Sequence, residues 1–276
     1  MKEWLLTTPL ATSVLGLREW FTLKSLPTVN PEKAALVANG IIADRLIARI
    51  CTPGGTFLDI GAHLGSILAA VRRHSDDVQL VAVEADAGKF ASLKRRFPDC
   101  RFLQCAVGET AGKSIFYTFP NRSGFNSLTP SDAHGAVETT VEVRTLDDLF
   151  PDLTVDTIKI DIEGAELGAL RGGKEMIARS RPTIMFESAG TERNALGYTP
   201  GDLHAWFTAN GFEIFLPDRL AHNSPPMDAP TFLDAHFYPM RSVNFFAVPT
   251  ERRIEIRDKA RRILRIMPVK LDTRLP

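Results

Sequence analysis

The sequence predicts an α/β fold, a doubly wound, seven-stranded and mostly parallel sheet with helices on both faces. Three observations predict it. Short apolar runs alternate with segments of helical periodicity through most of the chain. A glycine turn, Gly61 to Gly65, joins the first of these runs to a helical segment. Acidic residues end four of the runs, where the parallel strands of such a sheet present their ligand-binding edge.

The elements follow in an order that suits this fold. Helical segments separate the first five predicted strands, which indicates parallel pairing. Two later strands complete the sheet and can pair antiparallel, and a partly alternating pair predicts an antiparallel insertion after the third strand. The proline-rich residues 217–240 are expected to form a loop. The seven strands are predicted at residues 57–60, 79–83, 101–106, 156–161, 182–187, 212–216 and 242–248, and the insertion at 113–119 and 139–144.

The size and composition indicate one large globular domain with extensions. The chain has 276 residues, 44% of them hydrophobic, and a formal net charge of zero, which gives no drive toward nucleic acid. Three cysteines without paired spacing argue against a disulfide framework and a zinc site, which favours a reducing, cytoplasmic location. No apolar run reaches the length of a transmembrane helix, and polar residues interrupt the apolar N-terminus, unlike a signal peptide.

The chain is predicted to have three parts: an N-terminal helical cap at residues 1–50, a central domain at 51–250 and a basic extension at 251–276. The extension carries nine Lys or Arg residues against four Asp or Glu residues. An apolar stripe at helical spacing predicts an amphipathic helix docked on its own domain or in a homodimer. A peripheral contact with an anionic membrane is the alternative. The stripe consists of Ile256, Ala260, Ile263, Leu264 and Met267.

The predicted glycine turn has the spacing Asp59-x-Gly61-x-x-x-Gly65. A dinucleotide fingerprint needs glycines at the first, third and sixth places, but His63 and Ser66 occupy the last two. This failure disfavours a nicotinamide-dependent oxidoreductase. The spacing resembles the first motif of class I methyltransferases that use S-adenosylmethionine (SAM), and a purely structural turn is the alternative. Glycines here would let the backbone turn tightly and approach a ligand.

Two further strand ends fit such a cofactor. Glu84 ends the second strand, nineteen residues after Gly65, where a carboxylate can accept hydrogen bonds from both ribose hydroxyls. Ala85 follows it directly. Ala106 and Val107 end the third strand, and their backbone and small side chains could flank the adenine. A surface carboxylate or a helix cap is the alternative role for Glu84.

The chain resembles the FkbM family of SAM-dependent methyltransferases over roughly residues 35–250. The matching segments are FLDIGAHLGS, VAVEAD, CAVGETAG, RSGFNSL, VRTLDDL, IKIDIEGAEL, LRGG, PTIMFE and NFFAVP. His63 departs from the Asn that most relatives carry. The resemblance assigns residues 51–250 to a methyltransferase domain and implies methylation of a hydroxyl on a sugar, glycan or secondary-metabolite acceptor. It places the SAM site at Asp59, Gly61, Ala62, His63, Gly65, Glu84, Ala85, Ala106, Val107 and Asp161.

The resemblance also places the reacting side of the cleft at Asp161, Glu163 and Glu187, with Glu166 beside them. A hydroxyl is a weak nucleophile, so methyl transfer benefits from a proton acceptor or a metal. Asp161 is the first candidate for the base. Alternatively, Asp161 and Glu187 bind a divalent cation such as Mg²⁺, or Asp161 or Glu163 only caps the following helix. An N-methyltransferase and a non-catalytic SAM-fold scaffold are the other functions compatible with the sequence.

Overall fold

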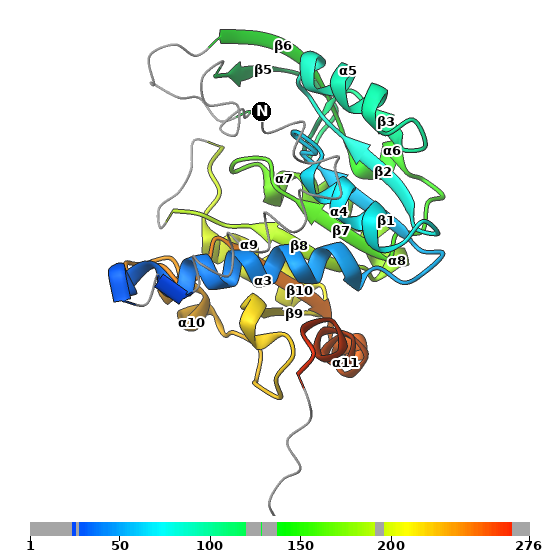
Figure 1. The fold of residues 1–276 in the computed structure, drawn as a ribbon. Helices are drawn as coiled ribbons and strands as arrows, with labels where there is room; N and C mark the ends of the chain where they lie inside the picture. Colours follow the sequence, from blue (N-terminus) through cyan, green and yellow to red (C-terminus); the bar gives the residue numbers. More distant parts are fainter. Residues whose placement is uncertain (1–23, 26–27, 120–127, 129–136, 191–195, 267–276) are drawn as a thin grey trace, which may run out of the picture.

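The computed structural model describes residues 24–25, 28–119, 128, 137–190 and 196–266 (Figure 1). Part of the predicted N-terminal cap, the RSGFNS segment before Leu128, and Met267 lie outside the described residues. Among the helices that the structure describes, none is long and apolar enough to span a lipid bilayer.

Seven strands form the central sheet: β1 (Thr56–Ile60), β2 (Gln79–Val83), β3 (Arg101–Leu103), β7 (Thr157–Ile160), β8 (Thr183–Glu187), β9 (Phe212–Phe215) and β10 (Asn244–Pro249). Their order is β3-β2-β1-β7-β8-β10-β9. The first five strands in this order run parallel, whereas β10 pairs antiparallel with both β8 and β9. The prediction of a mostly parallel sheet with an antiparallel end is therefore confirmed.

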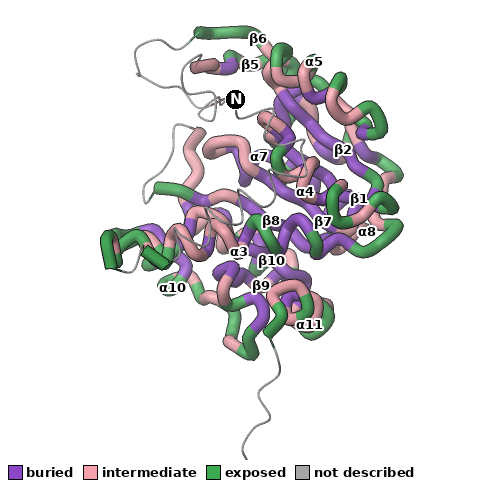
Figure 2. Tube along the Cα trace, in the orientation of Figure 1, coloured by how far each residue is buried: buried purple, intermediate pink, exposed green. Residues whose placement is uncertain are grey.

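Helices cover both faces of this sheet, as predicted (Figure 1). Side chains alternate along each strand, so Leu58 and Ile60 of β1 join one core whereas Phe57 joins the other. The strands are largely buried, and the exposed residues lie mainly on the outer helices and loops (Figure 2). The first core includes side chains of α6 (Leu146–Leu149), α7 (Glu166–Arg171), α8 (Lys174–Ser180), α9 (Pro200–Ala209) and α10 (Ala229–Asp234). The second includes those of α3 (Ala34–Ile50), which follows η1 (Pro31–Lys33), α4 (Ser66–His74), α5 (Ala87–Arg96) and α11 (Arg253–Leu264).

The C-terminal helix α11, which follows η4 (Thr250–Arg252), packs against α3. Ile256 and Ala260 are completely buried in the second core, and Ile263 and Leu264 lie partly buried against it. The described part of the predicted apolar stripe therefore faces the domain itself.

Three further strands form a small sheet in the order β4-β6-β5: β4 (Ala106–Val107), β5 (Gly112–Thr118) and β6 (Val137–Arg144). β5 and β6 pair antiparallel, which confirms the predicted insertion. The prediction of one strand over residues 101–106 is wrong, because the chain leaves the central sheet after Leu103. β4 instead finds backbone partners on β6, with which it pairs in parallel. The N–H of Gly108 then donates to the carbonyl oxygen of Arg144 (3.1 Å).

The prediction of a loop over residues 217–240 is wrong in part. Two short helical segments lie within it, η3 (Pro217–Arg219) and α10. Asp228 caps α10, since its side chain accepts a hydrogen bond from the N–H of Thr231 (2.9 Å), and a proline occupies the first turn. Phe232 of this helix is fully buried in the first core. Burial of this ring stabilises a helix that the proline-rich composition does not indicate.

Candidate active site

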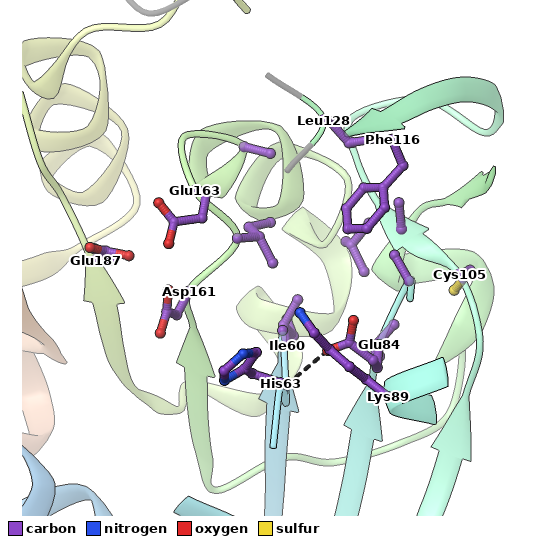
Figure 3. Close-up of a pocket in the computed structure, with 17 residues that line it drawn as sticks. Ile60, His63, Glu84, Lys89, Cys105, Phe116, Leu128, Asp161, Glu163 and Glu187 are labelled. Carbon is purple, nitrogen blue, oxygen red and sulfur yellow. Dashed lines mark hydrogen bonds between the residues drawn. The ribbon is translucent and has the colours of Figure 1, made fainter. Parts of the chain in front are cut away.

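A cavity of about 300 Å³ opens at the carboxyl ends of β1, β2, β7 and β8, the edge at which doubly wound sheets bind ligands. The three residues predicted for the reacting side, Asp161, Glu163 and Glu187, all line it. Figure 3 shows Glu84 toward one end of this cavity and the three carboxylates at the other. Seven of the ten residues predicted to contact SAM line it: Gly61, His63, Glu84, Ala85, Ala106, Val107 and Asp161.

Three predicted cofactor contacts, Asp59, Ala62 and Gly65, lie outside the wall of this cavity. Ala62 is buried in the second core. Gly65 has φ +71°, and a Cβ atom there would lie 2.7 Å from side-chain atoms of both Leu93 and Phe97. This glycine is therefore required for the close packing of its turn against Leu93 of α5 and against Phe97, which follows that helix.

Gly61 is required by the neighbouring strand end. Its φ of +79° favours glycine, and a Cβ atom there would overlap the backbone carbonyl oxygen of Asp161. The N–H groups of Gly61 and Ala62 donate to the carbonyl oxygen of Val83 (3.0 and 3.3 Å). Because Gly61 has no side chain, the ends of β1 and β7 can lie against each other. This contact joins the parts of the cavity wall that follow the two strands.

Glu84 lies just beyond β2 with only 5% of its surface exposed. Its carboxylate accepts hydrogen bonds from the backbone N–H groups of His63 (2.8 Å) and Asp86 (2.9 Å). These bonds fix the carboxylate at the cavity wall, and its further lone pairs can accept from hydroxyl groups of a ligand. Burial raises the pKa of Glu84, against the opposing effect of those N–H groups and of Lys89. This geometry fits the predicted contact with a ribose.

A buried lysine joins two aspartates next to the cavity. Lys159 of β7 lies opposite Asp59 of β1 in the parallel register. Its Nζ is 3.2 Å from Asp59 Oδ1 and 3.3 Å from Asp161 Oδ2, and it donates to the carbonyl oxygen of Gly61 (3.0 Å). Burial alone would lower the pKa of Lys159, but the two carboxylates raise it, so the ammonium stays charged. Asp59 is thus held inside the sheet as a partner of Lys159.

Asp161, Glu163 and Glu187 meet at the other end of the cavity (Figure 3). One carboxylate oxygen from each lies within 4.8 Å of those from the other two. A hydrogen bond between Asp161 and Glu187 needs a proton on one of the two carboxyl groups. Three oxygen atoms at this spacing could hold a divalent cation, and a shared proton is the other way to relieve their repulsion.

The surroundings separate the pKa values of these three groups. Burial raises the pKa of Glu187 to about 10, and its hydrogen bond with Asp161 adds to the effect. Burial also raises the pKa of Glu163 to about 7, helped by the charges of Asp161 and Glu166. Burial acts upward on Asp161 too, but the attraction of Lys159 and the hydrogen bond with Glu187 leave its pKa below the usual value. The surroundings therefore favour the ionised form of Asp161 and the protonated form of Glu187, and they bring the pKa of Glu163 near neutral pH.

The turn that carries Glu163 has an unusual backbone. Glu163 adopts φ +53°, and His63 in the other turn adopts +50°. Such values are uncommon for residues other than glycine and concentrate at functional sites. Glu166 fixes the turn, because its Oε1 accepts hydrogen bonds from the backbone N–H groups of Ile162 (3.0 Å) and Gly164 (3.2 Å). Glu166 thus has a positioning role beside the predicted reacting residues.

Lys159 and Phe116 are parts of the site that sequence reasoning missed. A lysine between two isoleucines in a predicted buried strand was a signal for an ion pair, because a buried charge requires a partner. Phe116 comes from β5 and lines the cavity, so the insertion contributes to the wall. The alternating pattern of residues 113–119 predicts a strand. It does not predict which part of the protein packs against each face of that strand.

Comparisons with known proteins show which family the chain belongs to. Residues 59–214 match the methyltransferase FkbM domain family. Methyltransferase sdnD of Sordaria araneosa is 25% identical over 181 residues, which cover 52% of this chain and 70% of that protein. The solved structure of methyltransferase FkbM from Methylobacillus flagellatus aligns over 86% of this chain and 60% of its own, with 17% identity and a TM-score of 0.44. A TehB-like SAM-dependent methyltransferase from Corynebacterium glutamicum aligns over 86% of this chain and 96% of its own, with 14% identity and a TM-score of 0.38. Because the family match covers more than half of the sequence, the chain belongs to the FkbM family of SAM-dependent methyltransferases.

Proposed function

We propose that this chain transfers the methyl group of SAM to a hydroxyl oxygen of a sugar, glycan or secondary-metabolite acceptor. The observation that carries the proposal is the division of one cavity into two chemically different ends. Glu84 is held by backbone N–H groups at one end, and Asp161, Glu163 and Glu187 gather at the other. The first end suits the binding of a nucleoside, and the second suits the removal of a proton.

The residues present fit SAM. Glu84 would accept hydrogen bonds from the ribose hydroxyls, and Val107, Phe116 and Ile162 provide apolar surface for an adenine ring. The ionised Asp161 would attract the positively charged methionine end. When bound, SAM supplies a methyl group attached to a sulfonium, which is a good leaving group.

Glu163 is the proposed proton acceptor, in place of the first candidate Asp161. A general base is most effective when its pKa lies near the operating pH, and the pKa of Glu163 is raised to about 7. Asp161 has a lowered pKa and is a weaker base, while Glu187 already holds a proton at neutral pH. Glu163 would therefore take the proton of the acceptor hydroxyl while the acceptor oxygen attacks the methyl group and S-adenosylhomocysteine leaves. Asp161 and Glu187 would stay hydrogen-bonded to each other, next to Glu163.

The test compares the wild type with Glu163→Gln and with the matched control Glu175→Gln, which changes an exposed glutamate on α8. Methyl transfer from radiolabelled SAM is measured over a panel of hydroxylated and amine acceptors, and binding of S-adenosylhomocysteine by calorimetry. We expect Glu163→Gln to lower transfer to a hydroxyl by about 10²- to 10⁴-fold, the usual contribution of a general base. Its affinity for S-adenosylhomocysteine should change by less than about threefold.

Three outcomes would contradict parts of this proposal. Transfer to amines alone would replace O-methylation by N-methylation, for which a strong base is not needed. Full activity of Glu163→Gln would remove Glu163 as the base. A folded wild type that binds no S-adenosylhomocysteine would contradict the cofactor assignment and favour a scaffold role.

A further inference from the structure

A lysine side chain from α5 reaches into the candidate active site. Lys89 lies in the first turn of that helix and lines the same cavity as Glu84 and Glu163. Figure 3 shows its side chain extending from α5 toward His63, alongside Glu84. Among the described residues that line the cavity, Lys89 is the only lysine or arginine. It is therefore the side chain that can offer a full positive charge to a ligand there.

We infer that Lys89 binds the carboxylate in the amino-acid part of SAM and is a further cofactor-binding residue of this site. The inference rests on the proposed function, because it concerns the same cofactor. The amino-acid part carries an ammonium group and a carboxylate on one carbon atom, so a complementary site offers an anion and a cation close together. Asp161 is the anion proposed for the ammonium group, and Lys89 is the matching cation.

Backbone hydrogen bonds fix the point from which the Lys89 side chain starts. The N–H of Lys89 donates to Oδ1 of Asp86 (2.9 Å), the residue that caps α5. The N–H of Asp86 donates in turn to Oε1 of Glu84 (2.9 Å). One short segment thus holds both Lys89 and the carboxylate proposed for the ribose. Because both groups would contact the same cofactor, this fixed connection lowers the ordering cost of binding.

The charges around Lys89 agree with a place between the two ends of the cavity. Burial lowers the pKa of its amino group, and carboxylates from both ends, among them Glu84 and Glu163, oppose this effect. Burial also lowers the pKa of His63, with a smaller contribution in the same direction from Lys89 and an opposite one from Asp161. The proposed cation and anion therefore both act on the His63 ring. This arrangement suits the two neighbouring charges of an amino acid.

The other lysine near the cavity is already matched by oxygen atoms. An ammonium group has three protons, and Nζ of Lys159 has three oxygen partners, two from Asp59 and Asp161 and one from a backbone carbonyl. The ring of His63 has a lowered pKa, which favours its neutral form. A carboxylate taken out of water requires a cation or hydrogen-bond donors, and here it would also lie near the ionised Asp161. Lys89 supplies the required positive charge.

The test uses two ligands that differ only in the carboxylate: S-adenosylhomocysteine and its decarboxylated analogue, in which a hydrogen atom replaces that group. Lys89→Met removes the positive charge and keeps most of the length of the side chain. Lys94→Met is the matched control, because Lys94 is an exposed residue of the same helix that lies outside the cavity wall. Binding of each ligand to the full chain of the wild type and of both variants is measured by calorimetry.

Wild type and Lys94→Met are expected to bind S-adenosylhomocysteine about 10- to 100-fold more tightly than the analogue, as a hydrogen bond to a charged group would give. Lys89→Met should lose this preference, because its affinity for S-adenosylhomocysteine falls while that for the analogue changes by less than about threefold. Equal binding of the two ligands by the wild type, a preference that survives Lys89→Met, or an equal loss of both ligands in that variant would overturn the inference. In each of these outcomes the wild type still binds S-adenosylhomocysteine. A folded wild type that binds neither ligand would instead overturn the proposed function.

Discussion

Two turns of this molecule begin with the same residue pair and have different roles. Asp59 and Ile60 are the last two residues of β1, whereas Asp161 and Ile162 follow the end of β7. Asp59 is 1% exposed and lies inside the sheet, while Asp161 lines the cavity. Both approach the Nζ of Lys159, at 3.2 and 3.3 Å. One buried cation therefore serves a structural carboxylate and a carboxylate of the candidate active site.

The difference between the two aspartates is one of depth along the strand. Asp59 pairs in register with Lys159, so Asp161 lies two residues further toward the carboxyl edge of the sheet. Two residues of strand correspond to about 6–7 Å. Because side chains alternate, the same spacing keeps Lys159 and Asp161 on one face of the sheet. A shift of two residues along the strand thus decides whether an aspartate lies inside the sheet or lines the cavity.

The largest expected effect comes from removing the cation that both turns share. Lys159→Met leaves Asp59 buried without its cation, and the free energy of unfolding should fall by about 3–5 kcal/mol. Urea denaturation measures this change. The double variant Asp59→Asn/Lys159→Met is the control, and it should recover much of the lost stability because the fully buried charge of Asp59 is removed together with its partner. A Lys159→Met protein as stable as the wild type would contradict the ion pair.

A second pair of variants separates the two aspartates. Asp161→Asn should weaken binding of S-adenosylhomocysteine by about 1.5–3 kcal/mol, the value of a hydrogen bond to a charged group. Asp59→Asn should do the reverse, lowering the free energy of unfolding by about 1–3 kcal/mol while ligand affinity changes by less than about threefold. Calorimetric titration and urea denaturation of both variants provide the comparison. Equal losses of affinity in the two variants would contradict the division of roles.

Much of this fold could be predicted because its strands are short apolar runs buried on both faces. Residues 79–83 are an example, and the structure places β2 over those same residues. The prediction fails where tertiary contacts decide the conformation. Phe232 stabilises α10 within a proline-rich segment, and β6 draws β4 away from the central sheet. Neither partner is visible in the local pattern of the segment concerned.

The candidate site was predictable to a similar degree. Glu84, Asp161 and Glu187 lie at or just beyond the ends of recognisable strands, and the carboxyl ends of parallel strands meet at one edge. The partnership of Asp59 with Lys159 was not predictable, because it depends on the register between two strands a hundred residues apart. The pKa differences within the carboxylate group likewise depend on distances and burial that no spacing in the sequence contains.

A proton shared by Asp161 and Glu187 should make the stability of the fold depend on pH. The pKa of Glu187 is raised to about 10, from 4.5 in an unperturbed glutamate, so above pH 4.5 the folded state binds a proton that the unfolded chain has lost. The stabilisation is complete at low pH and is lost as the pH rises toward 10. Between pH 7.5 and 8.5, the free energy of unfolding should fall by up to about 1.4 kcal/mol. In this window Glu163 and Glu166, with pKa values of about 7, have already lost most of their protons.

Glu187→Gln tests this dependence, because the amide mimics the protonated carboxyl group and cannot titrate. Urea denaturation at several pH values should show a flatter profile for Glu187→Gln than for the wild type. Glu175→Gln, which changes an exposed glutamate on α8, should keep the slope of the wild type. An unchanged slope in Glu187→Gln would mean that Glu187 is ionised in the folded protein.

The smallest expected effect is that of Mg²⁺, which would bind at Asp161, Glu163 and Glu187 if the carboxylates held a cation. The shared proton already lowers the negative charge there, and a cation would have to displace it. Millimolar Mg²⁺, compared with a chelator, should therefore shift the midpoint of thermal unfolding by less than about 1 °C. A bound cation present at a hundred times its dissociation constant would raise the free energy of unfolding by about 2.7 kcal/mol. For a chain of this size, that would raise the midpoint of thermal unfolding by several degrees. A shift of that size, lost in Glu187→Gln and kept in Glu175→Gln, would show that a metal replaces the proton and that metal activation of the hydroxyl is the better mechanism.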